Sequence, residues 1–238
     1  MPAIGIAQTV TQDDDDLAKS IVEKADRVRF PIESFEATVA ITTTGTDASP
    51  DPRRYRVYAK GSDSTIVMVT EPASDRGQAL LMKSRDLWIF LPTVSQPVRL
   101  SLSQRLTGQV ANGDLARANF AGDYNAKLLR TEKIDNESFY VLELTAVDRS
   151  VTYRRVLYWV QQGSYRPYKA EFYSLSDRLL KTSLYQNYKL MAGRERPTRL
   201  VMQNALAKDE ESVLEYSSMR VRDLPDRMFT KDYLKRLE

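Results

Sequence analysis

The sequence predicts a mainly β protein of the α+β class, in which an antiparallel sheet of about eleven strands curls into a barrel or half-barrel with a helix near each end. Two observations lead to this prediction. Short apolar segments, alternating or continuous, recur along most of the chain and are separated by turns rich in Gly, Pro, Asn and Asp. Strands joined by short turns form an antiparallel meander, and a sheet of this size curls instead of staying flat.

Length and composition favour one globular domain. The chain has 238 residues, of which 42% are hydrophobic and 28% charged, which is the balance of a soluble globular protein. No apolar run approaches the roughly 20 residues of a transmembrane helix, so we expect peripheral membrane contact only. The net charge of +3 arises from 35 basic and 32 acidic residues that are interspersed, and no basic block indicates nucleic-acid binding.

Histidine and cysteine are both absent. Their absence removes disulfides, thiolate nucleophiles, imidazole bases and the commonest transition-metal ligands. Four groups remain as candidates for acid–base chemistry: Asp123, Tyr124, Glu143 and Asp148. Without a histidine, a cysteine or an activated serine beside them, we expect a protein that is not an enzyme and holds no cofactor or metal.

The N-terminal region divides into two parts. Residues 1–12 are expected to be a signal-peptide remnant or a disordered N-terminus, because small residues precede Gln8 but most of a signal peptide is missing, and a single domain should follow at residues 13–238. The acidic residues 13–16 lack the spacing of a calcium loop and are interpreted as a helix start. That helix should end by Phe30 and have an apolar face formed by Leu17, Ile21, Val22, Ala25 and Val28.

The predicted strands follow this helix. Residues 34–44 alternate between apolar and polar side chains, as in a strand with one buried face. Residues 102–122 have no sustained period and are expected to form a long loop with one helical turn. Residues 230–237 should form a helix capped by Thr230, with Met228 or Phe229 packing on the sheet. The other predicted strands are residues 53–60, 65–71, 79–82, 87–91, 125–133, 138–147, 153–161, 168–174, 178–189, 198–207 and 212–221.

Several of these strands are apolar on both faces, so each face needs a cover. In residues 156–160 (VLYWV), for example, neither set of alternate positions is polar. Either the second face belongs to ordinary core, or it forms the wall of a cavity for acyl chains, which Met and aromatic side chains would suit. Periodicity alone leaves both interpretations open. The candidate lipid-binding wall consists of Met68, Leu80, Met82, Trp88, Phe90, Leu157, Trp159 and Met202.

The segment 77–101 (GQALLMKSRDLWIFLPTVSQPVRLS) carries a resemblance to a known family. It is similar to the region of LolA-like outer membrane lipoprotein-sorting proteins in which a Gly-plus-apolar strand leads into a D-x-W-x-y-x-P strand and then a basic strand. The loop GDLARANFAGDY, residues 113–124, matches part of that family's loop, and the ending FTKDYL, residues 229–234, is similar to its closing F-T-x-x-x-L helix. The matching positions in the first segment are Gly77, Asp86, Trp88, Phe90, Pro92 and Arg99.

The resemblance implies an antiparallel half-barrel of about eleven strands, covered by helices, around a hydrophobic cavity that accepts lipid chains. It also implies a periplasmic carrier in a Gram-negative bacterium that ferries lipoproteins or lipids toward the outer membrane. Its partners would be lipoprotein or lipid acyl chains, an inner-membrane transporter and an outer-membrane acceptor. Residues 21–28 and 108–122 are then the movable covers. The alternative is a module of the same fold that senses a lipid or lipoprotein and reports to a membrane partner.

Overall fold

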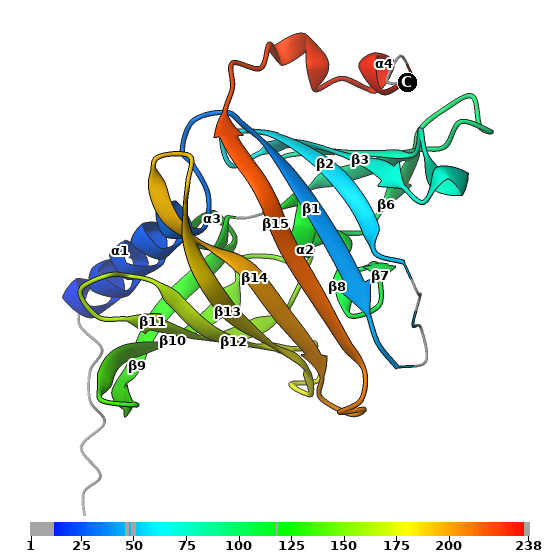
Figure 1. The fold of residues 1–238 in the computed structure, drawn as a ribbon. Helices are drawn as coiled ribbons and strands as arrows, with labels where there is room; N and C mark the ends of the chain where they lie inside the picture. The colour runs from blue at the N-terminus through cyan, green and yellow to red at the C-terminus, as the bar shows by residue number, and fades with distance from the viewer. Residues whose placement is uncertain (1–11, 46–47, 49–50, 118, 236–238) are drawn as a thin grey trace, which may run out of the picture.

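The computed structural model describes residues 12–45, 48, 51–117 and 119–235. Thirteen strands form one antiparallel sheet that curls strongly but does not close, so that it is a half-barrel (Figure 1). The predicted fold class is therefore confirmed, with thirteen strands in the sheet where about eleven were expected. The expected signal-peptide remnant lies outside the described residues, except for Gln12, where the first helix begins.

The sheet contains two series of strands, and each series is continuous in the sequence. The first runs outward from the centre and consists of β1 (Phe35–Thr43), β2 (Arg53–Lys60), β3 (Ser64–Glu71), β4 (Ala79–Lys83), β5 (Asp86–Phe90) and β6 (Val98–Leu100), with the 3-10 turn η1 (Ala73–Asp75) after β3. The second consists of β9 (Tyr124–Ile134), β10 (Glu137–Ala146), β11 (Arg155–Gln161), β12 (Pro167–Tyr173), β13 (Leu179–Met191), β14 (Arg194–Asn204) and β15 (Glu211–Val221).

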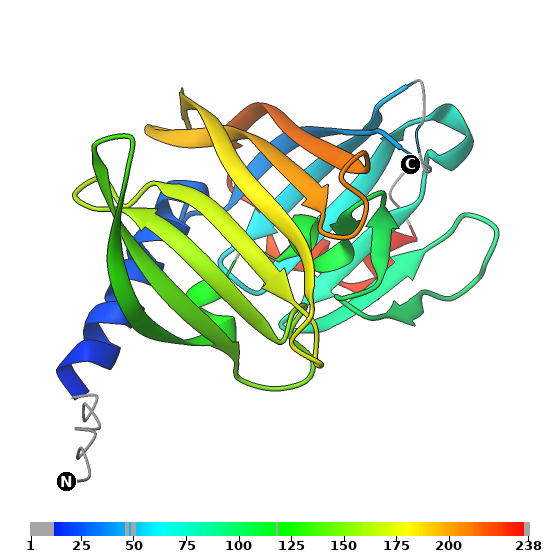
Figure 2. The same cartoon turned by 90° about the horizontal axis from the view of Figure 1, so that it is seen from below.

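The two series meet where β15 pairs with β1, and their far ends, β6 and β9, are the two free edges of the sheet. The chain must therefore pass from one edge to the other between β6 and β9. It does so through the hollow of the sheet, as Figure 2 shows from below. We call residues 101–123 the crossing segment. It contains β7 (Arg105–Thr107), β8 (Val110–Ala111), α2 (Asn112–Ala116) and α3 (Phe120–Asp123).

The prediction of a long loop with one helical turn over residues 102–122 was wrong. The crossing segment has a two-stranded sheet and two short helices, and it contributes buried side chains to the main core. A segment enclosed by the concave face must be apolar in several directions, so it shows neither the helical nor the strand period. Its buried apolar residues are Leu102, Val110, Ala111, Leu115, Ala116 and Phe120.

The first helix, α1 (Gln12–Arg29), packs against β9, β12, β14 and α3. It ends one residue before Phe30, as predicted. Its buried stripe differs from the prediction at one position, because Leu17 is 46% exposed and Ala18 is buried in its place. Among the described residues, no helix is long and apolar enough to span a membrane.

The C-terminal segment, residues 222–235, covers the outer face of β2 to β5 (Figure 1). It contains the 3-10 turn η2 (Asp226–Met228) and the short helix α4 (Lys231–Leu234). The Thr230 hydroxyl accepts a hydrogen bond from the Tyr233 amide, which confirms the predicted cap, and Phe229 is 2% exposed in its contact with the sheet. The C-terminal segment therefore covers the apolar outer face of β4 and β5.

Candidate functional site

A cavity of about 310 Å³ lies in the half-barrel at the C-terminal end of α1. This volume is at the lower end of the range for small-molecule sites. Most of the lining is apolar and comes from α1, the connection that follows it, the inner faces of β1, β2 and β15, and α2. The apolar lining residues are Phe30, Pro31, Ile32, Phe35, Ala37, Val57, Ala59, Leu115, Ala116 and Tyr216.

The strand pattern explains why this wall is apolar. In β1 the buried positions alternate with partly exposed ones, so Phe35 and Ala37 point to the same side. The Phe30 ring stacks on Phe35 at 5.9 Å between centroids and meets Tyr216 edge-on at the same distance. These contacts fix the end of α1 against the sheet. Ile32 lines the cavity and is 66% exposed, so it stands at the mouth.

Asp26 is the acidic residue of the cavity lining. One of its carboxylate oxygens accepts a hydrogen bond from the Ala121 amide at 2.9 Å, and the other pairs with Arg29 at 3.2 Å. Burial raises the pKa of Asp26 to about 6, against the opposing effects of Arg29 and of the backbone amides of Ala121 and Phe120. Arg29 also lies 4.3 Å above the centre of the Phe120 ring. This carboxylate therefore links α1 to the crossing segment.

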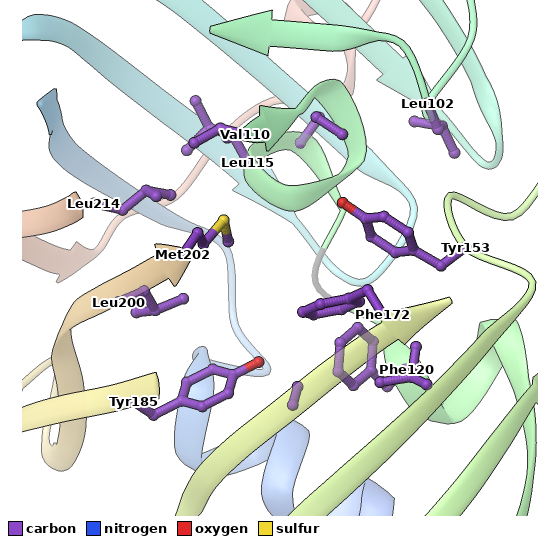
Figure 3. Close-up of a cluster of buried hydrophobic side chains, with 14 of the residues drawn as sticks. Leu102, Val110, Leu115, Phe120, Tyr153, Phe172, Tyr185, Leu200, Met202 and Leu214 are labelled. Atoms are coloured by element: carbon purple, nitrogen blue, oxygen red, sulfur yellow. The ribbon is translucent and has the colours of Figure 1, made fainter. Parts of the chain in front are cut away.

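A buried polar cluster attaches the crossing segment to the concave face of the sheet. Asp114 of α2 pairs with Lys181 of β13, and the two side chains are 6% and 5% exposed. The Tyr153 hydroxyl lies 2.9 Å from both carboxylate oxygens of Asp114, and the Ala111 amide donates to one of them at 2.7 Å. Figure 3 shows Tyr153 beside the apolar side chains of this region. The Asp114 carboxylate thus has hydrogen-bond partners in addition to Lys181, so the pair fixes the position of α2 inside the half-barrel.

A second polar cluster binds the end of the crossing segment to the β2–β3 and β4–β5 turns. Arg117 pairs with both carboxylate oxygens of Asp123, and it donates to the carbonyl oxygens of Ser62 at 3.3 Å and Ser84 at 2.6 Å. Arg85 donates to the same Asp123 at 2.9 Å. Asp123 is 4% exposed and accepts from two guanidinium groups, which is the arrangement of a structural ion pair.

At two glycines, the backbone of the crossing segment lies so close to neighbouring side chains that little room is left for a Cβ atom. Gly108 has a φ of +49°, and a Cβ there would lie 2.3 Å from the Ser212 hydroxyl. A Cβ on Gly113 would lie 2.0 Å from the Thr152 hydroxyl. Both distances are shorter than van der Waals contact, so a larger residue at either position would force a neighbouring side chain to shift.

Comparison with solved structures identifies the family. The chain is 64% identical to a LolA superfamily protein, NE2245, from Nitrosomonas europaea, with a TM-score of 0.86 over 91% of this chain and 98% of that one. The chain belongs to the LolA superfamily. A family model that carries the description "Uncharacterized protein" also matches residues 61–236. No curated protein matches the chain at a significant level.

Two more distant structures show the same fold. One is a domain described as an outer membrane lipoprotein-sorting protein from Vibrio parahaemolyticus, at 24% identity and a TM-score of 0.79 over 93% of this chain and 99% of that one. The other is a DUF1329 family protein from Desulfovibrio piger, at 22% identity and a TM-score of 0.78 with the same coverage. The LolA resemblance seen in residues 77–101, 113–124 and 229–234 is confirmed by the 64% identity to NE2245.

The eight residues predicted for a lipid-binding wall fall into three groups in this LolA half-barrel. Leu80, Met82 and Met202 belong to the main core, on the concave side of the sheet. The other five lie on the outer face. Met68, Trp88 and Phe90 pack beneath the C-terminal segment, whereas Leu157 and Trp159 pack with Phe139 and Val141 on the outer face of β10 and β11.

None of those eight residues lines the cavity at the end of α1. The strand period correctly separates the two faces of each strand, but it does not say which face is concave. Six of the residues that line the cavity lie in strands that the sequence predicted, namely Phe35, Ala37, Val57, Ala59, Thr65 and Tyr216. The others come from the end of α1, the connection after it, the β2–β3 turn and the crossing segment, where no strand period exists.

The candidate acid–base residues lie in two places. Asp123 is paired with Arg117 and Arg85, and Arg85 also pairs with Asp148 at 2.6 Å. Glu143 lies elsewhere and pairs with Arg155 at 3.5 Å on the outer side of β10. Asp148 is exposed, and hydrogen bonds from Ser150 lower its pKa. Burial raises the pKa of Tyr124 well above its usual value. None of the four lines the cavity at the end of α1.

Proposed function

We propose that this protein is a periplasmic carrier that binds the acyl chains of a lipid or lipoprotein and ferries the cargo toward the outer membrane, without catalysing a reaction. The observation that carries the proposal is the apolar cavity between α1, α2 and the concave face, in a chain 64% identical to a LolA superfamily protein. The similarity to a Vibrio domain described as lipoprotein-sorting supports the direction of transport.

Burial of apolar surface supplies the affinity in this proposal. Each methylene group that leaves water contributes about 0.8 kcal/mol, so even part of an acyl chain binds with useful strength. The cavity of about 310 Å³ suits part of one chain, because the crossing segment already fills much of the hollow. A lipoprotein with several acyl chains therefore requires α1 or the crossing segment to move outward. Outward movement of α1 would break the contact of Asp26 with the Ala121 amide and that of Arg196 with the α1 carbonyls, whereas movement of the crossing segment would break the two buried polar clusters.

Lipid binding can be tested with the purified protein. Organic extraction followed by mass spectrometry should recover bound lipid, and a dansyl-labelled fatty acid should bind and be displaced by unlabelled acyl chains. Substituting Ala59→Leu fills the cavity and should weaken binding several-fold. Ala40→Leu is the matched control, because Ala40 faces the other side of the sheet. If neither assay detects lipid, or if the two variants behave alike, the proposed cavity is not the binding site.

Transport requires a separate experiment. Fluorescent lipid should move from donor to acceptor vesicles faster in the presence of the protein, in proportion to its concentration. A module that only senses lipid, the alternative considered from the sequence, would bind the same lipid without accelerating its transfer. An inner-membrane transporter and an outer-membrane acceptor are the partners this proposal calls for, and cross-linking in cells of the source organism would capture them.

A further inference from the structure

A basic groove of about 480 Å³ adjoins the cavity. The two share Arg27, which lines both. The groove lies between the C-terminal half of α1, the β11–β12 turn and the β13–β14 turn. It holds four cationic side chains and one carboxylate, and its lining residues are Lys24, Arg27, Val28, Ser164, Tyr165, Arg166, Arg194 and Glu195.

The structure holds two of these cations in place. Lys24 donates to the Tyr165 hydroxyl at 3.2 Å and lies 4.5 Å from the centre of its ring. Arg166 pairs with Glu195 and lies 4.9 Å from the centre of the Tyr188 ring. The Glu195 carboxylate is thus paired with Arg166. It does not neutralise the other cations of the groove.

The other two cations, Arg27 and Arg194, are exposed, and neither forms an ion pair with any residue in the part of the chain that the structure describes. Arg196 lies close by and is 4% exposed. Burial and the charge of Arg194 together lower the pKa of Arg196 to about 10, although Glu33 acts in the opposite direction. Positive charge therefore accumulates at this end of the molecule, and an anion in the groove would relieve the repulsion.

The groove lies at a helix C-terminus, where free carbonyl groups ordinarily repel an anion. Here Arg196 donates to the carbonyl oxygens of Arg27 at 2.9 Å and Val28 at 3.2 Å. The guanidinium group neutralises the negative end of α1 and ties the backbone of Arg27 to β14. The groove therefore keeps its positive character despite its position.

We propose that this groove binds the phosphate of a lipid head group while the adjoining cavity holds the start of the acyl chain. The inference rests on the proposed function and narrows it to amphiphiles with an anionic head group. Because Arg27 belongs to both sites, a single molecule can have its phosphate beside Lys24, Arg27 and Arg194 and its chain beside Phe30 and Phe35. Arginine and lysine are the usual partners of phosphate.

The first test compares head groups on the same chain. Binding of lysophosphatidylglycerol and of the monoacylglycerol with an identical acyl chain is measured by calorimetry below the concentrations at which either forms micelles. We expect the anionic lipid to bind about tenfold more tightly, and its advantage to shrink as salt is raised. Inorganic phosphate is titrated separately and should bind far more weakly than the lipid.

The second test reverses two charges of the groove. The Lys24→Glu/Arg194→Glu variant should lose the preference for the anionic lipid and still bind the monoacylglycerol, because neither residue lines the cavity. Arg178→Glu/Lys208→Glu is the matched control, with the same change of charge at exposed positions in the turns beyond the opposite ends of β13 and β14. Circular dichroism shows whether each variant is folded. The Glu195→Gln variant should bind the anionic lipid more tightly.

The outcomes separate the two proposals. If neither lipid binds, both the carrier function and the head-group site are wrong. If the two lipids bind equally, or if the groove variant keeps the preference for lysophosphatidylglycerol, only the head-group site is wrong. If inorganic phosphate binds as tightly as the anionic lipid, the groove is a site for free phosphate and its assignment to a lipid head group is overturned.

Discussion

Lys181 on β13 and Asp114 on α2 form an ion pair inside the half-barrel, where their side chains are only 5% and 6% exposed. The pair joins a strand of the second series to the segment that crosses the hollow. Burial lowers the pKa of Lys181, while Asp114 opposes that change. Charges in such a place are stable only in one another's presence, so the pair keeps α2 in a fixed position.

Removing one charge of this pair should destabilise the protein strongly. Lys181→Met leaves Asp114 buried without its partner, and we expect a loss of about 3 to 5 kcal/mol in the free energy of unfolding, measured by urea denaturation. Lys181→Met/Asp114→Asn should recover part of this loss. Lys189→Met, an exposed position on the same strand, is the control. A cost of less than about 1 kcal/mol for Lys181→Met would show that α2 is not held by this pair.

The carboxylate of Asp26 should make stability depend on pH. Its pKa is raised from 3.8 to about 6 in the folded protein, so the folded state keeps a proton that the unfolded state releases. Stability attributable to Asp26 is therefore full below about pH 4 and falls as pH rises through 6, by about 3 kcal/mol in total. Denaturation of the wild type and Asp26→Asn should show this difference between pH 4 and 7. Parallel curves would contradict it.

The outer-face packing predicts that stability and lipid binding can be separated. Phe229→Ala opens a gap between the C-terminal segment and the sheet, and it should cost about 3 to 5 kcal/mol of stability. Trp88→Leu should cost less, because Trp88 is only partly buried beneath this segment. Both variants, once folded, should bind a dansyl-labelled fatty acid as the wild type does. If the folded Trp88→Leu variant lost fatty-acid binding, Trp88 would have to contact the lipid, as the sequence predicted.

The entry of the crossing segment into the hollow depends on Gly113. Gly113→Ala places a methyl group 2.0 Å from the Thr152 hydroxyl, and we expect a loss of about 1 to 3 kcal/mol by thermal or urea denaturation. Thr152→Ala removes the atoms that clash most and should restore much of the stability in the double variant. If Gly113→Ala is neutral by itself, the contact between α2 and Thr152 is looser than the structure indicates.

Much of the fold was predictable because it is encoded locally. The alternation in residues 34–44 predicted β1 within one residue at each end, and the Thr230 cap located the last helix. The candidate site was less predictable. Its lining begins at the end of α1, continues through Pro31 and Ile32 and returns in α2, and those positions have no common period. The basic groove likewise joins Lys24 to Arg194, which are far apart in the chain.

Local patterns predicted most of the strands, the antiparallel pairing of consecutive strands and the two-faced apolar character of the sheet, and the motifs in residues 77–101, 113–124 and 229–234 indicated the LolA family. The β1–β15 pairing, the concave face of each strand and the segments that cover it became apparent only in the folded chain. The reason is physical: side-chain alternation is a local property of a strand, whereas curvature and cover depend on segments that are distant in the chain. The C-terminal segment covers Trp88 and Phe90 on the outer face, and the crossing segment packs its buried apolar residues into the core within the hollow.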